Sequence, residues 1–195
     1  MGEATKSPLK VHFDRRLKIE FRGTTITSDA GLLAFRELDD ALGLTGMAAS
    51  RLTECRKGKN TQHALVALLR QSIFGRLAGY EDVNDAERLR LDPAMRSLVG
   101  HGDAPRYAAS TSEMARFETE QLATEENLEA LPDLSGHWID RVYERTALKG
   151  LVLDMDSSDS PTFGQQEGST FNGHFGFTCY HPLFVFNQFG DLERA

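Results

Sequence analysis

The sequence predicts an α+β protein, in which a mainly helical region over residues 1–148 precedes a short β region over residues 149–195. Two observations predict this division. Apolar residues recur at helical spacing through most of the first region, and after Gly150 the pattern changes to short apolar runs separated by glycine and proline. A chain of 195 residues suffices for one ordinary domain, or for a helical module joined to part of a second domain.

The composition is that of a soluble globular protein, with 40% hydrophobic and 26% charged residues. No apolar run approaches the roughly 18 to 20 residues that cross a bilayer, so we expect no membrane partner and a cytoplasmic location. Cys55 and Cys179 are too few for a disulfide framework or a cysteine-based zinc site. Two reduced thiols are therefore expected.

The charge balance argues mildly against a chain whose only task is to grip nucleic acid, because the net charge is −7. Two local segments are nevertheless basic, namely "FDRRLKIEFR" over 13–22 and "RLTECRKGKN" over 51–60. Each is either an ordinary solvated surface or a patch that faces phosphate groups. The ordinary surface is the favoured reading for each segment taken alone.

The first elements are one or two short strands and a helix. Residues 9–27 alternate and are rich in β-branched and aromatic side chains, which is typical of strands. Ser28 or Asp29 then provides an N-cap for an amphipathic helix that Gly43 ends.

Two further helices are expected in the next forty residues. A short one lies near 47–52, and a long, mostly buried one lies within 61–80, where Thr61 is a suitable N-cap. His63 stands at the start of the long helix without a second metal ligand four residues later, which favours a structural role.

The remaining helices are shorter. Residues 81–100 predict a turn and two helices, with Pro93 at a first helical position. Residues 109–122 predict a helix capped by Thr111 or Ser112. A last helix is expected over 133–148, and three of its side chains should pack inward: Trp138, Ile139 and Val142.

The β region contains three apolar or alternating runs, which we expect to form strands over 151–156, 169–180 and 181–192. The first run ends in acids. Side chains two apart on a strand point to the same side, so Asp154 and Asp156 should share one face, opposite Leu151, Leu153 and Met155.

Carboxylates at the end of a buried strand are costly unless something compensates their charge. A divalent cation such as Mg²⁺ is one compensator, because it prefers oxygen ligands and commonly takes one or two carboxylates. The alternative is that the acids accept hydrogen bonds from backbone amides at the turn around Pro161. The residues alone leave both readings open.

Four separated blocks of the sequence resemble, in the same order, segments of bacterial insertion-sequence transposases of the DDE-domain group 1 type. The blocks are "TSDAGLLAFRELDDALGL", "LLRQSIFGRLAGYEDVNDAERLRLDPAMRSLVG", "STSEMARFE" and "VLDMDSSDSPTFGQQEGSTFNGHFGFTCYHPLFVF". The resemblance extends from about Thr27 to Leu192 and is more specific than one acidic cluster.

This resemblance implies a ribonuclease H-like catalytic core, of which residues 149–195 would form the first three strands of an incomplete sheet. In such a core three acids bind two metal ions, Mg²⁺ or Mn²⁺, for cleavage and strand transfer of DNA. The implied DNA partner is the terminal inverted repeats of a transposon. Residues 1–148 become the candidate region for end binding and for contacts in a homo-oligomer or with a full-length transposase.

By the same resemblance, the first catalytic acid and metal ligand is Asp156 or Asp154. Asp156 is favoured because the related pattern places a Ser or Thr two residues after the catalytic Asp, and Ser158 stands there. The family's usual residue at this position is Thr, a departure that leaves a hydroxyl group in place.

Two further motifs match the family. Gly164 is expected to form a structural turn, while Gln165 or Gln166 is a candidate for contact with a DNA backbone. Tyr180 and His181 match at a second turn, where a structural role is favoured for His181.

The family's second Asp and final Glu have no counterpart here. Downstream of Asp159 the acids are Glu167, Asp191 and Glu193, all too close to the first strand. The sequence therefore predicts a truncated transposase, either a shortened reading frame or a fragment, that does not cleave DNA alone.

Two alternatives accompany this prediction. One is a non-catalytic DNA-binding or inhibitory partner of a full-length transposase. The other is a decayed remnant with an unpaired sheet edge on the hairpin "HPLFVFNQF", which predicts aggregation.

Overall fold

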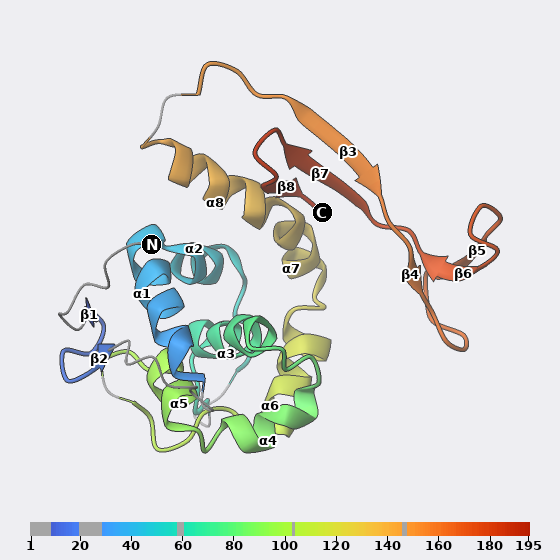
Figure 1. Ribbon diagram of the computed structural model, residues 1–195. Coiled ribbons are helices and arrows are strands. Elements are labelled where there is room, and N and C mark those ends of the chain that lie inside the picture. Colours follow the sequence, from blue (N-terminus) through green and yellow to red (C-terminus); the bar gives the residue numbers. More distant parts are fainter. Residues whose placement is uncertain (1–8, 20–28, 58–60, 103, 146–147) are drawn as a thin grey trace, which may run out of the picture. The chain divides into compact units, whose positions relative to one another are not determined.

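A computed structural model describes residues 9–19, 29–57, 61–102, 104–145 and 148–195. Helices precede two small antiparallel sheets along the chain, which confirms the predicted α+β class (Figure 1). The chain divides into two compact units, Met1–Leu128 and Glu129–Ala195, and each is described by itself. The predicted domain boundary at residue 148 stays a prediction.

The first unit begins with the strand pair that the alternating sequence predicts, and its helices follow. In chain order the elements are β1 (Leu9–Lys10), β2 (Lys18–Ile19), α1 (Leu32–Leu42), α2 (Leu44–Arg51), α3 (Leu65–Leu77), α4 (Ala86–Leu89), α5 (Pro93–Val99), α6 (Thr111–Arg116) and α7 (Glu125–Ala130). A 3₁₀ turn over Asp29–Gly31 leads into α1. Ser28, one of the two expected caps, lies outside the described residues.

Gly43 ends α1 as predicted, because it adopts the left-handed conformation with φ 76°. The cap predicted for α3 is wrong: α3 starts after Ala64, three residues beyond Thr61. The His63 ring explains the late start, since its two nitrogens bond to Glu113 and to the backbone oxygen of Tyr107. These contacts hold the segment before α3 against another part of the unit and confirm a structural role for His63.

The N-terminal caps of α5 and α6 are side chains. Asp92 accepts a hydrogen bond from the Met95 amide at 2.8 Å, with Pro93 at the first helical position as expected. For α6 the cap is Ser110, whose side chain accepts from the Glu113 amide, so the predicted cap at Thr111 or Ser112 is wrong by one or two residues. A π-helical turn then follows over residues 117–121.

The core of the first unit is mainly aliphatic, but a charged cluster is buried beside it. The apolar core residues include Leu32, Leu33, Phe74, Leu89, Met95, Leu98 and Val99. Arg36, Asp39 and Arg70 are also buried. Asp39 accepts a hydrogen bond from the Thr45 amide at 2.8 Å, and Arg36 donates to the Leu98 carbonyl at 3.0 Å. These polar groups tie α1 to the start of α2 and to α5.

The second unit contains one longer helix, α8 (Leu134–Tyr143), which packs against the strand β8. Ile139 is buried, while Trp138 and Val142 are half-buried, in agreement with the predicted inward face. Gly136 lies at the contact with β8: a Cβ atom at this position would lie 2.6 Å from the backbone oxygen of Glu193. The absence of a side chain therefore permits the close approach.

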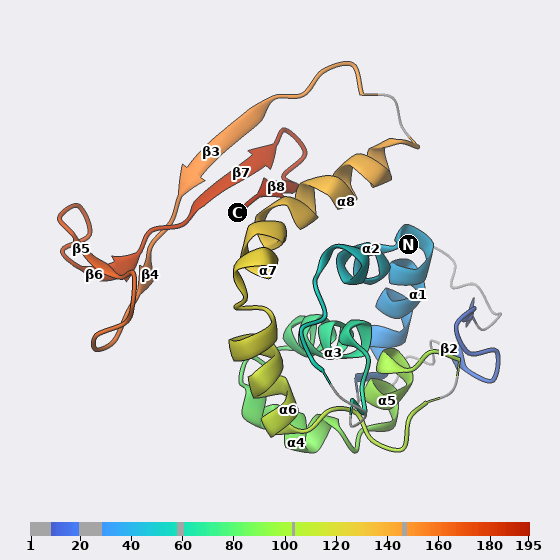
Figure 2. The same ribbon diagram turned by 180° about the vertical axis from the view of Figure 1, so that it is seen from behind.

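Two antiparallel sheets complete this unit (Figures 1 and 2). The first has the order β3 (Leu153–Ser157), β7 (Leu183–Asn187), β8 (Leu192–Arg194), and the second has the order β4 (Ser160–Pro161), β6 (Phe177–Tyr180), β5 (Thr170–Asn172). Three consecutive antiparallel neighbours are consistent with the beginning of a ribonuclease H-like sheet.

The run predicted as one strand over 181–192 is two strands. Asn187 ends β7, and its side-chain oxygen accepts hydrogen bonds from the amides of Phe189 at 2.9 Å and Asp191 at 3.1 Å. This turn returns the chain along β7 as β8. Because β7 is paired on both sides, the unpaired edge predicted on the hairpin over 181–189 is wrong.

Candidate metal centre

The strand β3 carries the two acids on one face. In its pairing with β7, Asp154 lies opposite Phe186 and Asp156 lies opposite Phe184. Directly opposed side chains of an antiparallel pair share a face, so the carboxylates lie beside two aromatic rings whose centroids are 6.3 Å apart. The predicted common face of the acids is confirmed by this register.

Both carboxylates lack partners among the residues that the structure describes. Neither Asp154 nor Asp156 has a side-chain hydrogen bond or ion pair with any residue that the structure describes, and both residues are exposed. The alternative in which backbone amides at the turn around Pro161 cap these acids therefore has no support in the described residues. The exposed carboxylate oxygens of Asp154 and Asp156 are therefore available to bind a cation from solvent.

The opposite face of β3 differs from expectation. Leu153 is 54% exposed and Met155 is 69% exposed, so the strand is not buried within the described residues. The burial was predicted from the apolar run alone. In the second unit, α8 packs on β8 rather than on β3.

No third acid joins the pair in the part of the chain that the structure describes, where no group of three or more metal-binding side chains gathers. Asp159 lies beyond the end of β3. Asp191 and Glu193 are engaged in another interaction. The side-chain nitrogen of Asn187, Nδ2, donates hydrogen bonds to their carboxylates at 3.1 Å and 2.8 Å. The Tyr143 hydroxyl also donates to Asp191, which raises the pKa of that phenol.

The local charge around the acids is negative. No lysine or arginine occurs between Lys149 and Arg194. A phosphate group that approached the acid face would therefore meet carboxylates without a compensating cation. Two neighbouring carboxylates of this kind fit the preference of Mg²⁺ for a few protein oxygens completed by water and phosphate oxygens.

The neighbouring motif residues occupy turns. Gly164 has φ 81°, a conformation that favours glycine, as expected for a structural turn. Gln165 and Gln166 are exposed. The Tyr180 hydroxyl donates to the Glu167 carbonyl at 2.8 Å, and the His181 ring lies edge-on to Phe175 at 5.7 Å.

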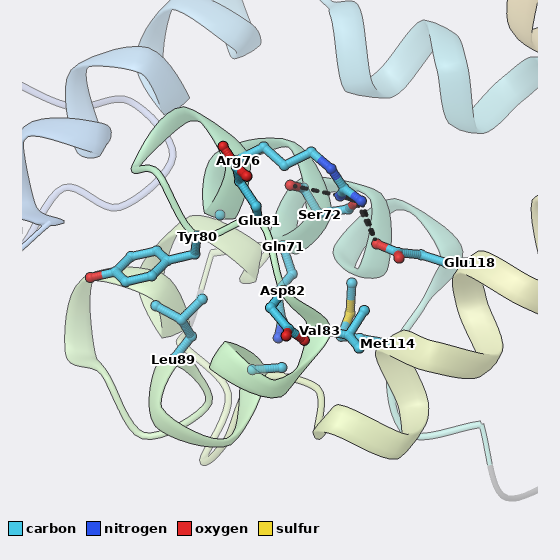
Figure 3. Close-up of a pocket in the computed structure, with 12 residues that line it drawn as sticks. Gln71, Ser72, Arg76, Tyr80, Glu81, Asp82, Val83, Leu89, Met114 and Glu118 are labelled. Atoms are coloured by element: carbon cyan, nitrogen blue, oxygen red, sulfur yellow. Dashed lines mark hydrogen bonds and ion pairs between the residues drawn. The ribbon is translucent and has the colours of Figure 1, made fainter. Parts of the chain in front are cut away.

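The first unit contains a separate cavity that is too small for a substrate. Its volume is about 30 Å³, which is about the space of one water molecule. Figure 3 shows Arg76 at its rim, bonded to Ser72 and, at 2.8 Å, to Glu118. This ion pair closes the side of the cavity between α3 and the segment after α6.

The two basic segments differ in how their cations are used. In the first, Arg16 bonds to Asp14 and lowers the pKa of that carboxyl to about 2. In the second, Arg56 bonds to Glu54 at 2.5 Å, which raises the pKa of the guanidinium and lowers the pKa of the carboxyl. The next cation, Lys57, has no partner among the described residues.

Lys57 belongs to a second, larger pocket in the first unit, with a volume of about 260 Å³. Arg116 and Gln121, some sixty residues away along the chain, line the same pocket. Sequence reasoning missed this grouping, because nothing local to α6 or to the segment at 51–60 signals that they meet.

Comparison with known proteins gives one match. A family model described as "Transposase DDE domain group 1" matches residues 9–195. No curated protein and no solved structure matches significantly. In the described residues, no helix is both long and apolar enough to span a membrane.

Proposed function

The chain belongs to the transposase DDE domain group 1 family, and from this premise we propose that it serves metal-dependent phosphodiester cleavage and strand transfer at transposon ends. One observation on the molecule supports the proposal most strongly. Asp154 and Asp156 present two unpartnered carboxylates on one face of a strand, in a segment without lysine or arginine.

In this proposal, Asp156 is the first catalytic acid, and Asp154 is the alternative. Their oxygens would hold Mg²⁺ or Mn²⁺, with two ions in the complete family core. A bound divalent ion supplies charge neutralisation at the scissile phosphate and activation of the attacking water or 3′-hydroxyl. The carboxylates themselves fix the cation on the exposed face of β3.

The metal assignment is tested with Mn²⁺ and the full 195-residue chain by calorimetry or by water-proton relaxation. We expect Asp156→Asn to weaken Mn²⁺ binding at least tenfold, since a charged ligand is lost. Asp154→Asn shows whether the second acid is also a ligand. Asp159→Asn is the matched control, because it removes an acid of the same segment. Unchanged Mn²⁺ affinity in both the Asp156 and Asp154 variants would overturn the assignment.

The catalytic status is tested with DNA that carries the element's ends. We expect the 195-residue chain alone not to cut or join this DNA, because one pair of carboxylates does not fix two ions in an in-line geometry. Cleavage with Mg²⁺ or Mn²⁺ that is lost in Asp156→Ala would contradict this expectation and show that other acids complete the site.

A second function is favoured by the distribution of acids and bases. The described residues bring only two free carboxylates together, while nearly all lysines and arginines lie in residues 1–149. We therefore also propose a non-catalytic role, in which the chain binds transposon-end DNA or inhibits a full-length transposase by forming a mixed oligomer.

This second role predicts a salt-dependent shift of end-containing DNA that is absent with a scrambled sequence. It also predicts inhibition of strand cleavage when the chain is added to a full-length relative. Equal, weak binding to both DNAs together with no inhibition would reject this role and leave a decayed remnant.

A further inference from the structure

The larger pocket of the first unit, which we name the α6 pocket, is rich in charge. Three cations line it, Arg56, Lys57 and Arg116, together with two carboxylates, Glu113 and Glu120. Its volume of about 260 Å³ lies just below the range of pockets that enclose drug-sized ligands. The α6 pocket therefore suits a small charged group, such as one unit of a larger molecule.

One cation and one carboxylate of the pocket are already neutralised. Arg56 bonds to Glu54 and lies 4.0 Å from Glu113. Glu113 in turn lies 2.9 Å from the His63 ring. These residues form the fixed frame of the α6 pocket and offer little charge to a ligand.

The exposed residues of the pocket are not neutralised. Within the ranges described by the structure, Lys57, Arg116 and Glu120 have no hydrogen-bond or ion-pair partner. The free cations outnumber the free carboxylate. An anionic ligand is therefore favoured over a cationic one, and Glu120 opposes it.

The inner wall of the pocket contains an unsatisfied polar group. Gln121 is 3% exposed, and its Oε1 accepts no hydrogen bond from any described residue. A buried acceptor without a donor costs free energy, and most such groups in native proteins are paired. A ligand that carries a donor beside its anionic group would remove this cost.

We propose that the α6 pocket binds one nucleotide of a DNA strand, with its phosphate on Lys57 and Arg116 and an amino group of its base toward Gln121. This inference rests on the proposed function, in which DNA is the partner. A nucleotide supplies a negative charge for Lys57 and Arg116 and a hydrogen-bond donor for Gln121. Lysine and arginine are the side chains that most often contact DNA phosphates.

The test measures binding of a fluorescent DNA duplex to the full chain at several salt concentrations. The double variant Lys57→Gln and Arg116→Gln should reduce the slope of log K against log salt by about one, since the two side chains hold one phosphate and each neutralised phosphate contributes about 0.9. The matched control is Arg51→Gln with Arg141→Gln, which removes two exposed arginines outside the pocket. An equal change in both double variants would overturn the site.

Two further variants separate charge from hydrogen bonding. Glu120→Gln should strengthen DNA binding, because it removes the opposing carboxylate. Gln121→Met should weaken binding at every salt concentration without changing the slope, and wild-type affinity in that variant would exclude its contact. Each variant is compared with the wild type for thermal unfolding.

A last arm distinguishes a DNA strand from free phosphate. Inorganic phosphate should displace the duplex no better than chloride at equal ionic strength; selective displacement that requires Lys57 and Arg116 would show a free-phosphate site instead. These binding results are independent of DNA cleavage. A chain that binds DNA through this pocket without cleaving it supports the inference even where the catalytic proposal fails.

Discussion

At the scale of single residues, the buried cluster of α1 and α3 makes Asp39 the most sensitive charged position in the first unit. Asp39 Oδ2 lies 3.7 Å from Arg36 Nη1 and 3.6 Å from Arg70 Nε. Burial lowers the pKa of the Arg70 guanidinium, which reflects the cost of this charge in the interior. The carboxylate of Asp39 offsets that cost for both arginines.

We therefore expect Asp39→Asn to lower the free energy of unfolding by about 3 kcal/mol, because it leaves the two buried arginines with a single carboxylate partner, Asp40, and hence with an excess of buried positive charge. The measurement is chemical denaturation followed by far-UV circular dichroism. Glu126→Gln is the control, since it removes one exposed acid from the same unit and should change stability by less than about 0.5 kcal/mol. Equal effects would show that the cluster does not depend on this charge.

The hydrogen bond from Tyr143 to Asp191 gives a prediction on pH. The bond to the carboxylate raises the folded pKa of the phenol above its ordinary value of about 10. A group whose folded pKa is raised stabilises the protein below the unfolded pKa, and this contribution disappears as pH rises through the folded pKa.

Tyr143→Phe should thus lower the melting temperature at neutral pH, and the difference from wild type should begin to shrink near pH 10 and disappear as pH rises through the raised pKa of the phenol. Tyrosinate absorbance is measured against pH in the wild type and the variant, and the difference between the two curves gives the pKa of the Tyr143 phenol. A Tyr143 pKa at or below the ordinary tyrosine value would contradict the hydrogen bond from Tyr143 to Asp191. Tyr107→Phe provides the comparison, because the hydrogen bond that the structure gives Tyr107 involves its backbone oxygen rather than its hydroxyl.

At the scale of elements, the contact between α8 and β8 depends on a glycine. Gly136→Ala places a methyl group 2.6 Å from a backbone oxygen of Glu193, which cannot turn away as a side chain could. Overpacking of this kind costs about 1–3 kcal/mol and exceeds the gain of about 1 kcal/mol from better helix propensity. We expect a net loss of stability in the second unit.

The single tryptophan, Trp138, lies in α8 and reports this change by its fluorescence during denaturation. Gly150→Ala is the matched control, since a Cβ atom there meets nothing within 4 Å. Equal stability of Gly136→Ala and wild type would show that α8 shifts on β8 without cost.

The elements also show how far sequence pattern reaches. The spacing of apolar residues located α1 and α3, because each presents a repeating face to a core, and Pro93 after Asp92 located α5. It did not locate α7, since six residues give too few turns for a periodic signal. The strand over 181–192 was predicted as one because the local turn that the Asn187 side chain forms with the amides of Phe189 and Asp191 lies inside an apolar run and was not recognised.

The sequence predicted one feature of the candidate metal centre and missed another. The alternation of a strand placed Asp154 and Asp156 on one face, and the register with β7 confirms this. The exposure of Leu153 and Met155 was not predictable, because burial depends on which elements cover a strand. The α6 pocket was hidden for a related reason: Lys57 and Arg116 meet only through the fold.

At the scale of the whole molecule, charge is distributed unequally along the chain. Residues 150–193 contain acids but no lysine or arginine, so the cations that attract DNA lie almost entirely in residues 1–149. Phosphate and carboxylate repel each other unless a divalent cation lies between them. Contact between DNA and the acid-bearing strand should therefore depend on the metal.

This dependence predicts a result for photo-crosslinking of the full chain to DNA that carries the element's ends, followed by peptide mapping. With a chelator present, crosslinks should fall in residues 1–149, because nearly all lysines and arginines lie there. With Mn²⁺ or Mg²⁺, new crosslinks should appear near β3, and Asp156→Asn should remove them while Asp159→Asn retains them. Crosslinks near β3 in the presence of chelator would mean that DNA reaches this strand without a metal, and that the acid pair serves a purpose other than metal binding.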